Sequence, residues 1–154
     1  MTPWLLVTLI VALDQASKLA VRAWMRPSGS IALLPRILHL TYVQNTGMAF
    51  GLFRGYPYVF VALAIGVAAW IVHELRQGPR HGWAMYSLAL VLGGAIGNLI
   101  DRVRLGYVVD FIDLRVWPVF NLADSAITIG VIILIWRSMF PDKTATESRG
   151  QHAS

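Results

Sequence analysis

Four long apolar stretches constrain the fold of this chain more than any other feature of its sequence. The hydrocarbon core of a membrane is about 30 Å thick, and a helix needs roughly 20 mostly apolar residues to cross it. Four stretches of suitable length lie near Trp4–Ala23, Tyr58–Arg76, Trp83–Arg102 and Phe120–Phe140. The sequence therefore predicts an all-α membrane protein with four transmembrane helices.

The composition supports a membrane protein and disfavours other classes. Hydrophobic residues make up 56% of the 154-residue chain and charged residues 14%, against roughly 45–50% and about 25% in soluble domains. The net charge of +5 comes mostly from Lys and Arg at the ends of the apolar stretches. Such residues meet lipid headgroups, so no nucleic-acid partner is expected. Cysteine is absent, which excludes disulfides and thiolate chemistry.

The connections between the stretches predict how the helices are joined. The short, basic segment Arg76–Arg80 contains a Gly-Pro pair, which predicts a hairpin of the second and third helices. The longer link, about 24–57, contains the alternating segment Ile37–Val43, which predicts short strands and a small sheet between the first two helices. Residues 1–140 are expected to form a single membrane domain. The polar tail, 141–154, has no hydrophobic period and is expected to be disordered.

Asp14 and Lys18 lie inside the first apolar stretch. A charged residue within a membrane span costs about 2.5–3.5 kcal/mol, so each one needs a partner or a function. Residues four apart share one face of a helix, so the two side chains are expected to form a buried ion pair that orients the helices. Direct participation in a site is the alternative.

Two other carboxylates are expected at one face of the membrane. Asp110 follows the third stretch, and Asp124 lies near the start of the fourth. A turn through residues 117–118 can bring them together. Two carboxylates at the edge of a hydrocarbon layer cannot both ionise cheaply, so they are expected to share one proton. Such a pair can act as acid and base on a water molecule, which is the chemistry of aspartic peptidases.

Two alternatives to this pair stay open. Asn121 and Asp124 have the spacing of a helix N-cap and its acidic partner, which is a purely structural arrangement. Asp113 is a competing partner for catalysis, although on an extended segment it would point away from Asp110.

The third stretch ends in polar residues. Asn98, Asp101 and Arg102 share one helix face at the same membrane edge as the carboxylate pair, and an interfacial anchor is the structural alternative. Gly93 and Gly97 are followed by no Gly-Lys-Ser/Thr motif, so they predict close helix packing rather than a phosphate loop. No metal or cofactor is expected, because the histidines are scattered without the spacing of metal ligands: His39, His73, His81 and His152.

Five segments in this order resemble the lipoprotein signal peptidases, the aspartic signal peptidase II family of bacteria. Any one of them is a weak signal, but together they extend from residue 14 to residue 124 of a chain of the right length. They are Asp14-Gln-Ala-Ser-Lys18, Asn45-Thr-Gly-Met-Ala-Phe50, Gly93-Gly-Ala-Ile-Gly-Asn98-Leu-Ile-Asp-Arg102, Val108-Val-Asp-Phe-Ile112 and Phe120-Asn-Leu-Ala-Asp124.

The resemblance implies an enzyme of the bacterial inner membrane that removes the signal peptide from diacylglyceryl-modified prolipoproteins, just before the modified cysteine. A monomer is expected. Both termini would be cytoplasmic, and the site and the sheet would be extracytoplasmic, where the sheet would help to clamp the lipidated substrate. Lys and Arg are spread too evenly over the two faces to give this orientation by themselves. The segment from Asp113 to Phe120 is compact for the family.

The resemblance also implies roles for individual residues. Asp110 and Asp124 match the catalytic aspartates of the family. Seven further polar residues would hold this pair and the substrate backbone in place: Asp14, Lys18, Asn45, Asn98, Asp101, Arg102 and Asn121.

A small proton-coupled membrane transporter is the main alternative function, because acidic residues inside membranes also form proton relays. A transporter needs an acid near the middle of the membrane and access from both sides, whereas the acids of this chain cluster at one end. A purely structural membrane subunit would not explain this cluster of costly polar groups.

Overall fold

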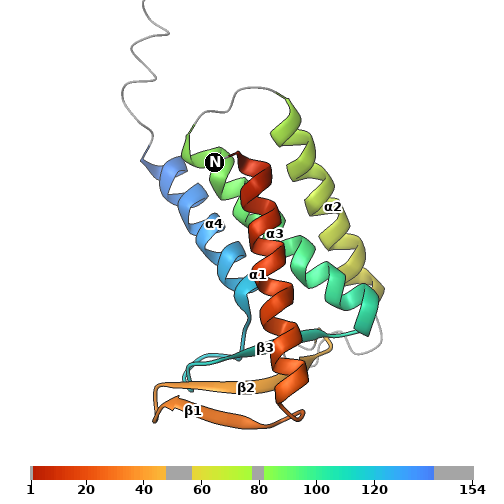
Figure 1. Cartoon of the computed structure of the whole chain (residues 1–154). Helices are drawn as coiled ribbons and strands as arrows, with labels where there is room; N and C mark the ends of the chain where they lie inside the picture. Colours follow the sequence, from red (N-terminus) through yellow and green to blue (C-terminus); the bar gives the residue numbers. More distant parts are fainter. Residues whose placement is uncertain (1, 48–56, 78–81, 141–154) are drawn as a thin grey trace, which may run out of the picture.

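The computed structural model describes residues 2–47, 57–77 and 82–140. In this part of the chain the elements follow one another as α1 (Pro3–Trp24), β1 (Ser30–Leu34), β2 (Leu38–Asn45), α2 (Pro57–Arg76), α3 (Trp83–Leu105), β3 (Val108–Asp113) and α4 (Leu122–Met139). The helices form one bundle, and the sheet lies across one end of it (Figure 1). The helix bounds agree with the predicted stretches to within a few residues.

Three of the described helices, α1, α3 and α4, are long and apolar enough to cross a membrane. Their outer faces expose many large apolar side chains, among them Leu9, Leu13, Ile132 and Ile135. Hydrocarbon is the solvent that suits such a surface, so the protein is an integral membrane protein. The helix α2 has 20 residues and packs against α3, and it stays a predicted fourth span.

The helix α3 lies at the centre of the bundle, where it contacts α1, α2 and α4. Glycines on α3 make this close packing possible. A Cβ atom at Gly97 would lie 2.5 Å from Oδ2 of Asp14, and one at Gly93 would lie 2.9 Å from Cβ of Ile10. The prediction that these two glycines serve close helix packing is therefore confirmed.

Gly94 offers a test of this packing. Its substitution by alanine should lower the free energy of unfolding by about 1–3 kcal/mol, because the new methyl group would collide with the backbone carbonyl of Ala123 on α4. Gly66→Ala on α2 is the matched control. No atom lies within 4 Å of a Cβ at Gly66, so this change should stabilise the helix by roughly 0.5–1 kcal/mol. Unfolding in mixed detergent micelles measures both, and a fully stable Gly94→Ala variant would contradict the packing.

The sheet is antiparallel, with β2 between β1 and β3. The sequence predicted a sheet built only from the link between the first two helices, and this was incomplete, because β3 follows α3. The sequence signal of a half-exposed strand is an alternation of apolar and polar residues. The short segment Val108–Asp113 lacks this alternation, because most of its residues are buried. Pairing places Val43 opposite Asp110 and Asn45 opposite Val108. The sheet thus fixes the segment that carries Asp110.

Candidate active site

The start of α4 positions Asp124. Asn121 is the N-cap residue, and its Oδ1 accepts a hydrogen bond from the backbone N–H of Asp124 at 2.9 Å. In return, Oδ2 of Asp124 accepts from the backbone N–H of Asn121 at 3.3 Å. The predicted capping arrangement is therefore present. It occupies only one carboxylate oxygen, because Oδ1 of Asp124 accepts a hydrogen bond from Nδ2 of Asn98 on α3 at 2.7 Å.

Asp110 lies on β3 and is 2% exposed. Its Oδ2 accepts a hydrogen bond from Nδ2 of Asn45 at 2.8 Å, and its Oδ1 accepts one from Nδ2 of Asn121 at 2.7 Å. Burial raises the pKa of Asp110 to about 6. The hydrogen bond from Asn45 favours the ionised form and opposes this shift, whereas the negative charge of Asp124 adds to it.

Asn121 connects the two carboxylates, since its side-chain amide donates to Asp110 and its backbone N–H donates to Asp124. A chain reversal between β3 and α4 makes this possible. Ile112 and Phe120 exchange backbone hydrogen bonds of 2.7 and 3.0 Å on either side of the reversal. A chain reversal between Asp110 and Asp124 is therefore present, as predicted, and it brings both side chains to Asn121.

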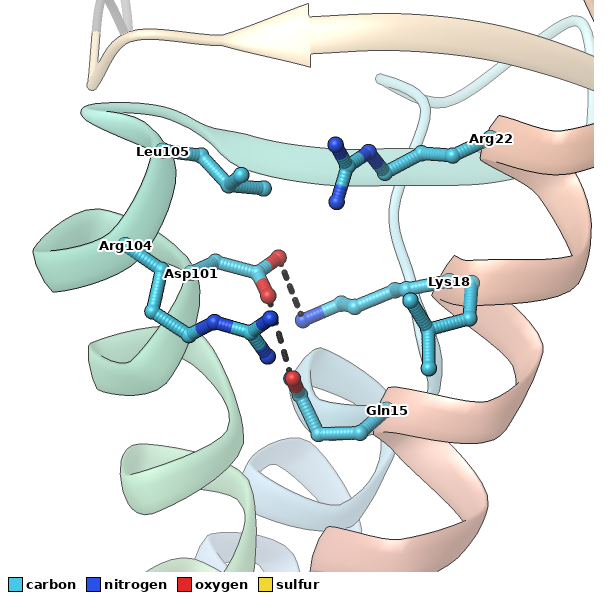
Figure 2. A pocket seen from close by; sticks show the side chains of 7 residues that line it. Gln15, Lys18, Arg22, Asp101, Arg104 and Leu105 are labelled. Atoms are coloured by element: carbon cyan, nitrogen blue, oxygen red, sulfur yellow. Dashed lines mark hydrogen bonds and ion pairs between the residues drawn. The ribbon is translucent and has the colours of Figure 1, made fainter.

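A buried charged cluster lies beside this pair, between α1 and α3. Nζ of Lys18 lies 2.8 Å from Oδ2 of Asp14 and 3.1 Å from Oδ2 of Asp101, and it donates to Oδ1 of Asn98 at 2.9 Å. Figure 2 shows Lys18 of α1 pointing toward Asp101 of α3. The predicted ion pair between Asp14 and Lys18 is confirmed, and it includes a second carboxylate that the spacing alone did not show.

The cluster is linked directly to both segments of the carboxylate pair. Oδ1 of Asp14 accepts a hydrogen bond from the backbone N–H of Ala123, next to Asp124, at 3.0 Å. Oδ2 of Asp101 accepts one from the backbone N–H of Val109, next to Asp110, at 3.0 Å. Asn98 and Asp101 are buried, so the alternative that they are interfacial anchors is wrong.

Gln15 also belongs to this cluster, although its sequence position alone did not predict this. Its Nε2 lies 3.0 Å from Oδ1 of Asp101, 3.1 Å from the carbonyl oxygen of Gly97 and 3.3 Å from Oδ2 of Asp14 (Figure 2). The available signal was an uncharged polar residue beside Asp14 in an apolar stretch. Such a residue also needs partners inside a membrane protein.

Arg102 and Asp113 lie at the margins of the site. Nη1 of Arg102 donates to the carbonyl oxygen of Asn98 at 3.4 Å. Asp113 has different partners from those of Asp110, because it accepts hydrogen bonds of 2.8 Å from Oγ1 of Thr41 and from the backbone N–H of Arg115. These bonds lower the pKa of Asp113. Asp113 is thus separate from the carboxylate pair, as expected for its position on the strand.

A groove of about 410 Å³ opens beside Asp124. Its walls come from the segment between β3 and α4 and from one face of α4, and they are mostly apolar: Leu114, Trp117, Phe120, Asp124, Ser125, Thr128 and Ile129. Such a groove suits an apolar ligand segment beside the carboxylate.

Three described helices are long and apolar enough to cross a membrane, and two carboxylates joined through Asn121 lie at one end of the bundle. These features define an integral membrane protein with a candidate acid–base site. The chain belongs to the signal peptidase II family, because the family model described as "Signal peptidase (SPase) II" matches residues 6–140. The family resemblance seen in the sequence motifs is confirmed.

Individual relatives agree with this assignment. The chain is 52% identical over 141 residues to a protein of Moorella thermoacetica named "Lipoprotein signal peptidase". The matched region covers 90% of this chain and 94% of the relative. A protein of the same name from Halothermothrix orenii is 45% identical over 132 residues, covering 86% and 91%. A solved structure described as a bacterial membrane enzyme has a TM-score of 0.84 and 31% identity, covering 92% of this chain and 90% of that one.

Proposed function

We propose that this protein removes signal peptides from diacylglyceryl-modified prolipoproteins by hydrolysing the peptide bond before the modified cysteine. Membership of the signal peptidase II family supports this function. The observation that carries the mechanism is the pairing of Asp110 and Asp124 through Asn121, at the end of a membrane helix bundle.

The proposed reaction is a direct attack by water. The pair holds one proton and one water molecule. The ionised carboxylate takes a proton from the water, whose oxygen forms a bond to the carbonyl carbon, while the protonated carboxyl group hydrogen-bonds the carbonyl oxygen. The protonated carboxyl group gives its proton to the carbonyl oxygen, and a tetrahedral diol results. When the diol collapses, the C–N bond breaks and the C=O bond forms again. One hydroxyl proton returns to the carboxylate that supplied it, and the proton taken from water passes from the other carboxyl group to the leaving amine. The mechanism forms no covalent bond to the enzyme and needs no cofactor.

The groove beside Asp124 suits the proposed substrate. The signal peptide would enter sideways from the bilayer as a helix, and its end would unwind next to the carboxylate pair. The apolar walls formed by Trp117, Phe120 and Ile129 support binding of an apolar segment at this position. The acyl chains of the modified cysteine would stay in the lipid.

The proposed topology has four spans in a single domain, residues 1–140, of a monomeric inner-membrane protein. The helix α2 would be the fourth span, since it has 20 residues and lies within the same bundle (Figure 1). Both termini would then lie on one side of the membrane. The family resemblance makes this the cytoplasmic side, with the sheet and the carboxylate pair on the extracytoplasmic side. The expected disordered tail, 141–154, and the motif residues 48–50 lie outside the described residues.

The proposed specificity can be tested with the purified protein in detergent. One precursor is prepared with and without the diacylglyceryl group on its cysteine, and the products are identified by mass spectrometry. We expect a single cut before the cysteine of the modified precursor only. Equal cleavage of both precursors, or none, would contradict the proposal.

The transporter alternative is not favoured, because Asp110 and Asp124 lie at one end of the bundle.

The pKa of Asp110 predicts how the activity depends on pH. A pair that needs one proton loses it as the pH rises through about 6, so kcat/KM should fall above this pH. In the Asn45→Ala variant, the fall of kcat/KM should occur at a higher pH, because the substitution removes a hydrogen bond that favours ionised Asp110. Gln44→Ala is the control, since the Gln44 amide donates to Tyr42 and Tyr107 instead. If kcat/KM of the Asn45→Ala variant fell at the same pH as in the wild type, this role of Asp110 would be ruled out.

A further inference from the structure

Two arginines form a basic pocket on the flank of α1 and α3, next to the sheet. Arg22 lies in the last turn of α1, and Arg104 lies in the last turn of α3. Both line one small pocket, together with Lys18 and Asp101. Its volume of about 10 Å³ holds little more than one water molecule, so a larger anion would lie at the mouth of the pocket, between the two guanidinium groups. Figure 2 shows the two guanidinium groups pointing from opposite helices into the space between them. We refer to this site as the Arg22–Arg104 pocket.

The charges of the two arginines are not balanced within the protein. Neither residue forms an ion pair with a carboxylate of the described ranges. Asp101, the acid that lines the pocket, is already paired with Lys18 and accepts hydrogen bonds on both oxygens. Asp14, Lys18 and Asp101 together carry one net negative charge, so the two arginines leave one net positive charge at the pocket. A singly charged anion would neutralise it.

A wider groove continues from Arg22 toward the sheet and adds a hydroxyl donor. This groove has a volume of about 420 Å³, and its walls include Tyr42 and Tyr107. The amide of Gln44 donates to both phenolic oxygens at 3.2 Å, and these oxygens lie 3.5 Å apart. Only one of the two phenolic protons can lie between the two tyrosine oxygens. The other O–H group can therefore donate a hydrogen bond to an anion in the groove.

The position of the pocket identifies the membrane as the source of this anion. Both arginines lie in the last turn of apolar helices, which is the level of the lipid headgroups. Trp24, just beyond Arg22, is 89% exposed, as expected for an aromatic residue at this level. Deeper in the bilayer, the exposed side chain of Leu19 continues the same face of α1 and would lie along an acyl chain.

We propose that Arg22 and Arg104 bind the phosphodiester of an anionic membrane phospholipid at the mouth of their pocket, where the wider groove begins. Guanidinium groups match phosphate oxygens in charge and in geometry, and a phosphodiester carries the single negative charge that the pocket lacks. The lipid would bridge the ends of α1 and α3 on the flank of the bundle. This site is distinct from the groove beside Asp124, and its function does not depend on the peptidase reaction.

Native mass spectrometry of the purified full chain in detergent, titrated with dioleoyl-phosphatidylglycerol, tests the proposal. Arg22→Gln and Arg104→Gln should each raise the Kd of the lipid by about tenfold, because each removes charged hydrogen bonds to one phosphate. Arg22→Lys should lose less affinity, since it keeps the charge. Arg26→Gln is the matched control: Arg26 is exposed near the same end of α1 but does not line the pocket. It should leave the Kd unchanged.

Two competitors identify the bound group. Dioleoylglycerol, which has no phosphate, should not bind in the pocket, and excess inorganic phosphate should not displace the phospholipid. Displacement by inorganic phosphate would mean that the pocket binds a free ion, and an equal effect of Arg26→Gln would mean a diffuse attraction to the basic helix ends. Either result would overturn the proposal. Cleavage of prolipoprotein is not measured, so failure here leaves the proposed peptidase function untouched.

Discussion

Cleavage of a lipid-modified precursor should slow by at least about 10³-fold when either Asp110 or Asp124 is replaced by asparagine. Asparagine preserves the size of the side chain but can neither take up nor release the proton that the proposed reaction moves. Asp110→Asn also removes the buried carboxyl group whose pKa lies at about 6. Initial rates at saturating and at low precursor concentration should show the loss in kcat rather than in KM alone.

Asp113→Asn is the matched control for this prediction. Asp113 lies on the same strand as Asp110, but it accepts hydrogen bonds from Thr41 and Arg115 and is separate from the carboxylate pair. Its substitution should leave the rate within a few-fold of the wild type. All variants must show the wild-type unfolding transition in detergent. Near-normal activity of Asp110→Asn or Asp124→Asn would show that the assigned pair is wrong, and Asp113 or Asp101 would then be the next candidate.

The parts of the site that were predicted correctly depend on local geometry. The ion pair of Asp14 and Lys18 follows from a spacing of four residues on one helix, and the N-cap at Asn121 follows from a spacing of three. The cost of charge in a membrane then indicates that acids near one face need partners. These arguments need no knowledge of which helices are neighbours.

The parts that the sequence analysis did not predict depend on contacts between distant segments. Gln15 contacts Asp101 and Gly97 only because α1 packs tightly on α3. The strand β3 pairs with β2 across more than 60 residues of sequence, and periodicity within a short buried strand cannot show such a partner. The double role of Asn121, which caps α4 and holds Asp110, likewise appears only when β3 and α4 are placed together.

Lys18→Met should lower the free energy of unfolding by about 3–5 kcal/mol, the usual cost of breaking a buried ion pair from one side. Methionine fills a similar volume, but the change leaves Asp14 and Asp101 buried without their counter-charge. Unfolding of the purified protein in mixed detergent micelles measures the loss. Arg22→Gln, which removes an exposed positive charge one turn further along the same helix, should change the stability little.

The double variant Asp14→Asn/Lys18→Met separates the loss of charge balance from the loss of packing. It leaves one buried carboxylate instead of two, so it should recover part of the stability lost in Lys18→Met. Asparagine at position 14 keeps an oxygen that can accept the hydrogen bond from the backbone N–H of Ala123, so the first turn of α4 should stay in place. If the double variant were no more stable than Lys18→Met, uncompensated charge would not be the cause. The contribution of Lys18 would then come from its contacts with Asn98 and the surrounding helix packing.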